Sequence, residues 1–185
     1  FTNSSAEDGF KINIEDLKSK ISSKTKFIII NSPNNPTGRV MSKEELLQIA
    51  DLARENPNIN ILSDEIYELI LKKEFKHYSL SSLANDLKDR IFIINGFAKG
   101  WAMTGWRIGY LVGPKDVIKA SSALQSQSTS NVCSFVQKGA LEALKINNEY
   151  FSMINSHYDQ RRRLLYEGLN NINGIYIEEP NGAFY

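Results

Sequence analysis

Apolar and polar positions divide the chain into two kinds of segment. Short, continuous apolar runs rich in β-branched residues occur at 26–31, 59–66, 90–95 and 106–112. Runs of this length are typical of strands buried on both faces. Elsewhere, apolar residues recur every three or four positions, which predicts amphipathic helices at 14–21, at 43–55 and, with breaks near residues 130 and 147, from 114 to about 172.

Capping residues support these boundaries. Asn13 can cap the first helix, and Ser42 precedes Glu45 by three residues, the spacing of a capping box. The segment 56–58 ends the second helix, and Gly174 ends the last helical region before a further expected strand at 175–177. Buried strands that alternate with helices indicate an α/β fold with a mostly parallel sheet.

Composition narrows the class of protein. The 185 residues carry 22 Lys+Arg against 21 Asp+Glu, so the net charge of +1 gives no electrostatic case for nucleic acid or an anionic membrane. A hydrophobic content of 42% argues against disorder, and a single cysteine excludes a disulfide framework. No apolar run reaches the roughly 18 residues of a membrane span. The first residues do not read as a signal peptide. The lone cysteine permits a reducing compartment, and we expect a cytoplasmic protein.

Polar residues follow three of the expected strands, at the sheet edge where ligands of parallel sheets gather. Residues 31–38 read Asn-Ser-Pro-Asn-Asn-Pro-Thr-Gly, and residues 64–67 read Asp-Glu-Ile-Tyr. Each has an ordinary structural explanation, a turn with local asparagine hydrogen bonds in the first case and a helix cap in the second.

A lysine and an arginine follow the third strand. Lys99 lies among small and apolar residues between two glycines, a setting that favours a desolvated, nucleophilic amine. Arg107 lies between Trp106 and Ile108 and needs an anionic partner there. Together with the Asn, Asp and Tyr of the other two loops, these side chains suit a phosphorylated pyridine aldehyde, with a Schiff-base lysine and an acid opposite the ring nitrogen.

The same segments carry a family resemblance. Residues 31–38, residues 64–67 and Ala-Lys-Gly-Trp-Ala-Met-Thr-Gly-Trp-Arg-Ile-Gly-Tyr at 98–110 resemble the motifs of class I/II aminotransferases, pyridoxal-phosphate (PLP) enzymes of fold type I. The resemblance covers essentially the whole chain and looks most like the bacterial and archaeal aspartate aminotransferase branch, some members of which also act on prephenate.

The resemblance implies a role for five residues. Lys99 would bind the cofactor as a Schiff base and then move the substrate α-proton, and Asp64 would pair with the pyridine nitrogen. Tyr67 and Asn35 would hydrogen-bond the phenolic oxygen, and Arg107 would bind the phosphate. It also implies a homodimer that acts on small amino acid and 2-oxo acid substrates, aspartate or a related amino acid with 2-oxoglutarate.

Other positions depart from the family pattern or add little to it. Many relatives carry serine where this chain has Gly96 and Ala98, which puts a hydroxyl contribution to phosphate binding in doubt. The pair 130–131 falls where relatives reach toward the neighbouring subunit. Cys133 is interpreted as a small buried residue, and His77 and His157 as surface or packing residues. No metal site is expected.

The resemblance also predicts a domain division. Residues 1–150 would be part of the large PLP-binding domain, and 151–185 a connecting helix and the start of the small C-terminal domain. Because the chain begins with Phe1 and ends in the strand-like 183–185, we expect a segment of a longer protein, inactive alone. Two alternatives stay open: a lyase or synthase of the same fold, and the aminotransferase-like sensor domain of a transcription regulator. The Met-Thr-Gly-Trp wording at 103–106 favours transamination, whereas a winged-helix segment upstream would reveal a regulator.

Overall fold

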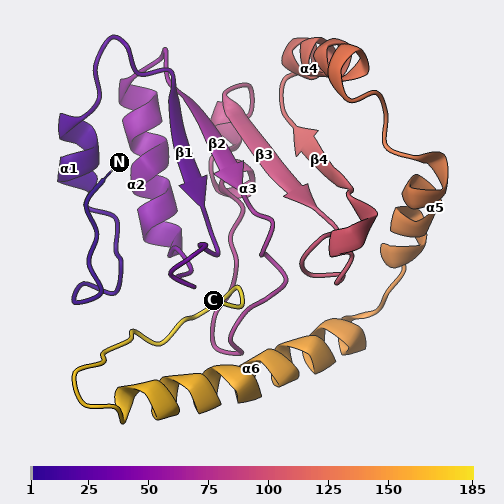
Figure 1. The fold of residues 1–185 in the computed structure, drawn as a ribbon. Helices are drawn as coiled ribbons and strands as arrows, with labels where there is room; N and C mark the ends of the chain where they lie inside the picture. The colour runs from indigo at the N-terminus through magenta and orange to yellow at the C-terminus, as the bar shows by residue number, and fades with distance from the viewer. Residues whose placement is uncertain (1) are drawn as a thin grey trace.

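The computed structural model describes residues 2–185 as a sheet with helices around it (Figure 1). The helices and strands, in order, are α1 (Ile14–Ser19), β1 (Phe27–Asn31), α2 (Lys43–Glu55), β2 (Asn60–Asp64), α3 (Leu80–Leu83), β3 (Ile91–Gly96), β4 (Gly109–Val112), α4 (Lys115–Ser128), α5 (Ser134–Ala143) and α6 (Asn148–Asn170). Two short 3₁₀ helices, η1 (Asn85–Leu87) and η2 (Thr104–Trp106), lie in the connections.

The sheet has the order β1-β2-β3-β4. The first three strands are parallel, and β4 runs antiparallel to β3. The carboxyl ends of β1, β2 and β3 therefore meet at one edge, toward which their arrows point in Figure 1. Helix α6 lies across this end, and the C-terminus returns to it (Figure 1). The expected α/β class with a mostly parallel sheet is confirmed.

One face of the sheet holds the main core. Helix α2 packs its apolar side on this face, and α3 contributes to the same cluster of buried residues. The buried members include Ile30, Ile49, Ile61, Leu80 and Ile91, each at most 5% exposed. The predicted capping box on α2 is present, since Ser42 Oγ accepts from the Glu45 N–H and the Glu45 carboxylate accepts from the Ser42 N–H. Asn13 caps α1 as predicted.

The opposite face of β1 is open, which corrects the expectation that this strand is buried on both sides. Phe27 is 47% exposed and Ile29 is 70% exposed, whereas their neighbours Ile28 and Ile30 are buried. The alternation follows from the two-residue period of a strand, because helices within residues 2–185 cover one face of β1 and leave the other exposed. The apolar run therefore predicted the strand correctly and its burial wrongly.

Two expected strands near the C-terminus are wrong. The backbone of Ile177 bonds with a side chain instead of a strand: its N–H donates to Asn170 Oδ1 at 3.0 Å and its carbonyl accepts from Asn170 Nδ2 at 3.2 Å. Residues 183–185 form a turn, next to an isolated bridge between Leu71 and Gly182. Asn170 at the end of α6 thus occupies the groups that a sheet partner would need.

The fourth strand is shorter than predicted. Residues 106–108 lie outside the strand, although the Ile108 carbonyl accepts from the Phe97 N–H at 3.3 Å. Helix η2 ends at Trp106, and Arg107 adopts a left-handed conformation with φ of 53°. Pairing with β3 begins only at Gly109, opposite Gly96. Within residues 2–185, no helix is both long and apolar enough to cross a bilayer.

Candidate active site

The side chain of Asn31 ties the loop after β1 to the end of β2. Asn31 and Asp64 are register partners at the last position of their strands. The Asn31 side-chain amide donates to the Asp64 carbonyl at 3.1 Å, and its Oδ1 accepts from the backbone N–H of Asn35 at 2.8 Å. Asn31 thus fixes the loop that carries Asn35 against the strand that carries Asp64.

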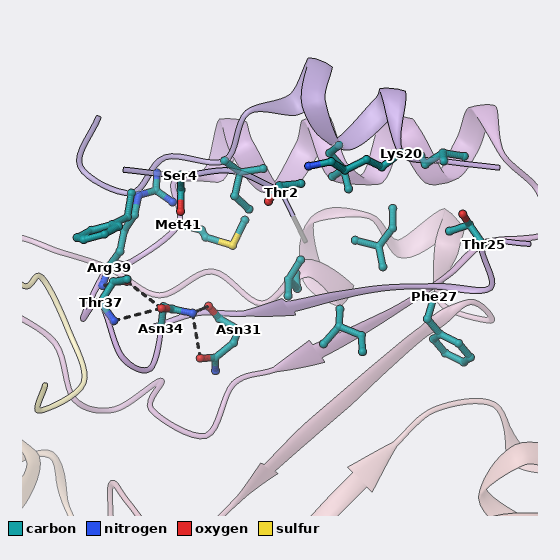
Figure 2. A pocket seen from close by; sticks show the side chains of 17 residues that line it. Thr2, Ser4, Lys20, Thr25, Phe27, Asn31, Asn34, Thr37, Arg39 and Met41 are labelled. Atoms are coloured by element: carbon teal, nitrogen blue, oxygen red, sulfur yellow. Dashed lines mark hydrogen bonds between the residues drawn. The ribbon is translucent and has the colours of Figure 1, made fainter. Parts of the chain in front are cut away.

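The loop after β1 is held by asparagine hydrogen bonds, as expected for such a turn. Asn34 Oδ1 accepts from Thr37 Oγ1 at 2.8 Å, and Asn34 Nδ2 donates to Asn31 Oδ1 at 3.3 Å. Figure 2 shows these bonds between Asn31, Asn34 and Thr37. Gly38 has a φ of +66°, and a Cβ there would lie 2.3 Å from Pro180, so this close turn requires glycine.

Asp64 is a half-buried acid at the end of β2. Its Oδ1 accepts one hydrogen bond, from the backbone N–H of Ile66 at 3.2 Å. Burial raises the pKa of the Asp64 carboxyl above its ordinary value, the Ile66 hydrogen bond lowers it, and the nearby Glu65 carboxylate raises it further. The charged form is therefore destabilised at this position, and a nearby cation would favour it.

Lys99 lies between aromatic rings in the turn that follows β3. Its Nζ is 5.4 Å from the centroid of the Tyr67 ring and 5.2 Å from that of Phe184. Both distances fall within the range of a cation–π contact. The lysine carbonyl accepts from the Ala102 N–H at 3.0 Å, which closes the turn and holds the residue near Tyr67. Sequence reasoning brought Lys99 and Tyr67 to one site, but it missed Phe184.

Tyr67 is 3% exposed, and its hydroxyl bonds with the hydroxyl of Tyr185 at 2.9 Å. This hydrogen bond raises the pKa of the Tyr185 phenol. Phe184 packs edge-on against Tyr67, with ring centroids 5.4 Å apart, and stacks on Tyr158 of α6. The C-terminal turn therefore completes an aromatic wall beside Lys99, although the sequence predicted a strand there.

Arg107 shares the connection between β3 and β4 with Lys99. Its side chain is exposed, and its Nη1 donates to the Thr104 carbonyl at 2.9 Å. No ion pair of Arg107 occurs within residues 2–185, so the anionic partner expected from the sequence is not part of the described chain. The structure places this arginine on the site's turn without bringing it to Asp64.

The residue at position 96 must be glycine for a steric reason. A Cβ at this position would lie 2.6 Å from the Gly109 Cα and 2.9 Å from the Ile108 carbonyl oxygen, both backbone atoms. Real Cβ atoms do not approach backbone so closely. Glycine at position 96 therefore allows β3 and β4 to meet at the base of the Lys99 turn.

The remaining predictions have mixed outcomes. Cys133 is exposed, which corrects the expectation of a buried cysteine; it lies outside the core because it immediately precedes the first turn of α5. His77 packs inside, as one of the two expected alternatives, with its Nε2 3.1 Å from Glu65. Ser130 and Asn131 are exposed between α4 and α5.

Two pockets flank the site without containing it. One, of about 460 Å³, lies between the N-terminal segment, α1 and the edge strand β1, and reaches Asn31 and Asn34 (Figure 2). The other, of about 470 Å³, lies between α6 and the C-terminal turn, and reaches Tyr185. Asp64, Tyr67, Lys99 and Arg107 line neither pocket.

Comparison with known proteins identifies a family. The sequence model of Aminotransferase class I and II matches residues 2–185. A "Probable aspartate/prephenate aminotransferase" of Rickettsia prowazekii is 46% identical over 185 residues, which are 100% of this chain and 46% of that protein. The chain therefore spans about half the length of the curated relatives it matches.

Solved structures give the same result. The aspartate aminotransferase from Rhizobium meliloti superposes with a TM-score of 0.93 at 35% identity, over 97% of this chain and 45% of that one. The Thermus thermophilus aspartate aminotransferase with maleate superposes with a TM-score of 0.89 at 42% identity, over 97% of this chain and 46% of that one.

Proposed function

We propose, since the chain belongs to the family of class I and class II aminotransferases, that the complete protein is a PLP-dependent aminotransferase. Its fold is that of the solved aspartate aminotransferases, as the fold type I expectation required. The observation that carries the proposal is the placement of Lys99 against Tyr67 and Phe184, in the turn beyond the strand that neighbours Asp64.

The donor set fits the cofactor by its chemistry. Pyridoxal phosphate offers an aldehyde, a basic ring nitrogen, a phenolic oxygen and a phosphate. The site offers a primary amine at Lys99, a half-buried acid at Asp64, polar side chains at Tyr67 and Asn35, and a guanidinium at Arg107. A protonated ring nitrogen would offset the desolvation that raises the pKa of Asp64.

Each residue has a defined task in this reaction. When bound, the cofactor supplies an electron sink for the bond broken at the substrate α-carbon. Lys99 Nζ would hold the cofactor through its aldehyde, and it would serve as the general base and acid that moves the substrate α-proton. Asp64 would keep the ring nitrogen protonated, Tyr67 and Asn35 would hydrogen-bond the phenolic oxygen, and Arg107 would bind the phosphate.

We propose that the substrates are aspartate, or a related amino acid, and a 2-oxo acid such as 2-oxoglutarate. Two observations on similar proteins support this: the Rickettsia prowazekii relative is named for aspartate and prephenate, and the Thermus thermophilus structure holds maleate, a dicarboxylate. The proposal is therefore for an acidic amino donor.

We further propose a cytoplasmic homodimer, in which residues 1–150 belong to the large domain and 151–185 begin the small one. Large apolar side chains on α4 and α5 support an interface: Leu124 is 72% exposed, Phe135 71% and Leu141 55%. Exposed apolar surface of this extent commonly marks association. Helix α6, which starts at Asn148, would be the connecting helix.

Borohydride reduction of the complete, PLP-loaded protein tests the proposal. The reduced pyridoxyl group should be recovered by peptide mass mapping on Lys99, and Lys99→Ala should abolish both the label and transamination. Lys76→Ala is a matched control, because Lys76 also lies over a ring, 5.2 Å from the centroid of Tyr78, but outside the site. A label on any other lysine refutes the assignment.

A further inference from the structure

Two adjacent acids at the end of β2 point to opposite faces of the sheet. Side chains alternate along a strand, so Ser63 and Glu65 share one face and Asp64 lies on the other. Burial follows this alternation: Ser63 is 4% exposed and Glu65 2%, while Asp64 is only half-buried. Glu65 therefore lies behind the acid that is proposed to contact the cofactor.

Both carboxylate oxygens of Glu65 are hydrogen-bonded to neighbouring side chains. Its Oε1 accepts from Ser63 Oγ at 2.9 Å and from Ser79 Oγ at 3.0 Å. Its Oε2 lies 3.1 Å from His77 Nε2, and because a carboxylate can only accept, His77 donates. A buried carboxylate is tolerated only with such partners. The result is a clamp between the end of β2 and the segment 77–79 that leads into α3.

Two of these residues, Glu65 and His77, also form a cluster with Glu68 that has the donor types of a cation site. Donor atoms of Glu65, Glu68 and His77 lie within 4.8 Å of one another. However, both oxygens of Glu65 already accept hydrogen bonds, and Glu68 Oε1 accepts from Asn95 Nδ2 at 2.6 Å. Both Glu65 oxygens, Glu68 Oε1 and His77 Nε2 are therefore already bonded to protein groups.

The clamp acts on the backbone that aims Asp64. The Glu65 N–H donates to the Ile94 carbonyl at 2.9 Å, which extends the pairing with β3 past the end of β2. The Asp64 carbonyl accepts from the Ser32 N–H at 3.1 Å. The peptide group between Asp64 and Glu65 is therefore bonded on both sides, and the Glu65 side chain is anchored behind the sheet, so the backbone that carries the Asp64 carboxyl is held in place.

We propose that Glu65, anchored by His77, Ser63 and Ser79, is a positioning residue that aims the Asp64 carboxyl at the cofactor. This inference rests on the proposed function. It requires that loss of Glu65 affect cofactor binding only through Asp64, whereas a residue that merely stabilises the fold would act independently of Asp64.

Two substitutions distinguish the effect of the Glu65 hydrogen bonds from the effect of its negative charge. Glu65→Ala removes all three hydrogen bonds. Glu65→Gln keeps an oxygen for the two serine hydroxyls and turns an N–H toward His77. His77 Nδ1 is buried and has no hydrogen-bond partner within residues 2–185, so the ring can move its proton to Nδ1 and accept at Nε2 without losing a bond elsewhere.

The test is a double-mutant cycle in the complete protein, with the dissociation constant for PLP and the visible spectrum of the bound cofactor as readouts. Glu65→Ala should weaken PLP binding about tenfold, the scale of one hydrogen bond to a charged group, and shift the spectrum. In the Asp64→Asn background it should change neither, because coupled residues are non-additive. Glu65→Gln should stay within about threefold of the parent protein.

Three outcomes overturn the proposal: Glu65→Ala weakens binding equally in both backgrounds, Glu65→Ala lowers only thermal stability, or Glu65→Gln is as weak as Glu65→Ala. Glu45→Ala is the matched control, since Glu45 is also a largely buried carboxylate with several partners but belongs to the α2 cap; it should not couple to Asp64. If the parent protein does not bind PLP, or Asp64→Asn has no effect, the proposed function fails instead.

Discussion

Asp64→Asn should move stability and activity in opposite directions. The amide oxygen of Asn can still accept from the Ile66 N–H, which lies 3.2 Å from the Asp64 carboxyl, so the shape of the turn is kept. The amide cannot hold a proton on the ring nitrogen. In the complete protein, turnover of aspartate with 2-oxoglutarate should fall by at least about 2–3 decades, equivalent to about 3–4 kcal/mol in the barrier.

The free energy of unfolding of the cofactor-free protein should instead rise on the Asp64→Asn substitution. Burial raises the pKa of Asp64 in the folded state, so the folded protein favours the protonated form. The contribution of protonated Asp64 to the free energy of unfolding is fully present below the pKa of the unfolded chain, about 3.9. It is lost as the pH rises through the higher pKa that Asp64 has in the folded protein. Above this window the ionised acid destabilises the fold, and Asp64→Asn should be the more stable protein at pH 7.

Urea denaturation of both cofactor-free proteins from pH 3 to pH 8 measures the difference. Asp86→Asn is a matched control with the opposite sign, because its hydrogen bond with Arg54 lowers the pKa of Asp86, and this variant should lose stability at neutral pH. The reasoning is refuted by turnover of Asp64→Asn within about tenfold of the parent, or by a stability deficit that grows with pH.

Four further predictions follow from the packing. Gly96→Ser should lower stability by about 1–3 kcal/mol in urea denaturation, without improving phosphate binding, because its Cβ meets the Gly109 backbone at 2.6 Å. Ser42→Ala should cost about 1 kcal/mol in the same assay through the lost cap of α2, with PLP affinity unchanged. Sedimentation of the complete protein should give a dimer, and a fully active monomer would contradict this. The 185 residues expressed alone should aggregate and lack turnover, because apolar side chains on β1 and β4 stand exposed at the sheet edges; saturable transamination above free cofactor would contradict it.

Local signals predicted most elements, because their causes are local. The Ser42–Glu45 box and the Asn13 cap are bonds between residues three apart, and both are present. The strand near residue 176 failed because its partner is the side chain of Asn170, a bond that an apolar pattern does not contain. The burial of β1 failed for a related reason: a continuous apolar run indicates a strand, but which faces are covered depends on other segments.

The candidate site was predictable where residue type alone defines the chemistry. Lys99, Asp64 and Tyr67 stand out as an amine, an acid and a phenol beyond strand ends. Phe184 was missed, because its contact with Lys99 joins residues 85 positions apart and resembles ordinary core packing in the sequence. Glu65 was missed although its signal was available, since a strand that reads Ser-Asp-Glu must bury one of two adjacent acids when one face is covered by helices.

This adjacency also explains why the two acids need different environments. An acid that pairs with a cationic ring must be charged while the ring is bound, and its carboxyl must keep its direction while the site is empty. If this acid were buried among strong hydrogen-bond donors, its direction would be fixed, but the same donors would stabilise its negative charge whether or not the ring is bound. The structure divides the requirements between neighbours: Glu65 takes the buried partners, and Asp64, with a single hydrogen bond from Ile66, keeps its carboxyl available. A raised pKa at Asp64 is the physical sign of that availability, since an acid destabilised as an anion gains most when a cation arrives.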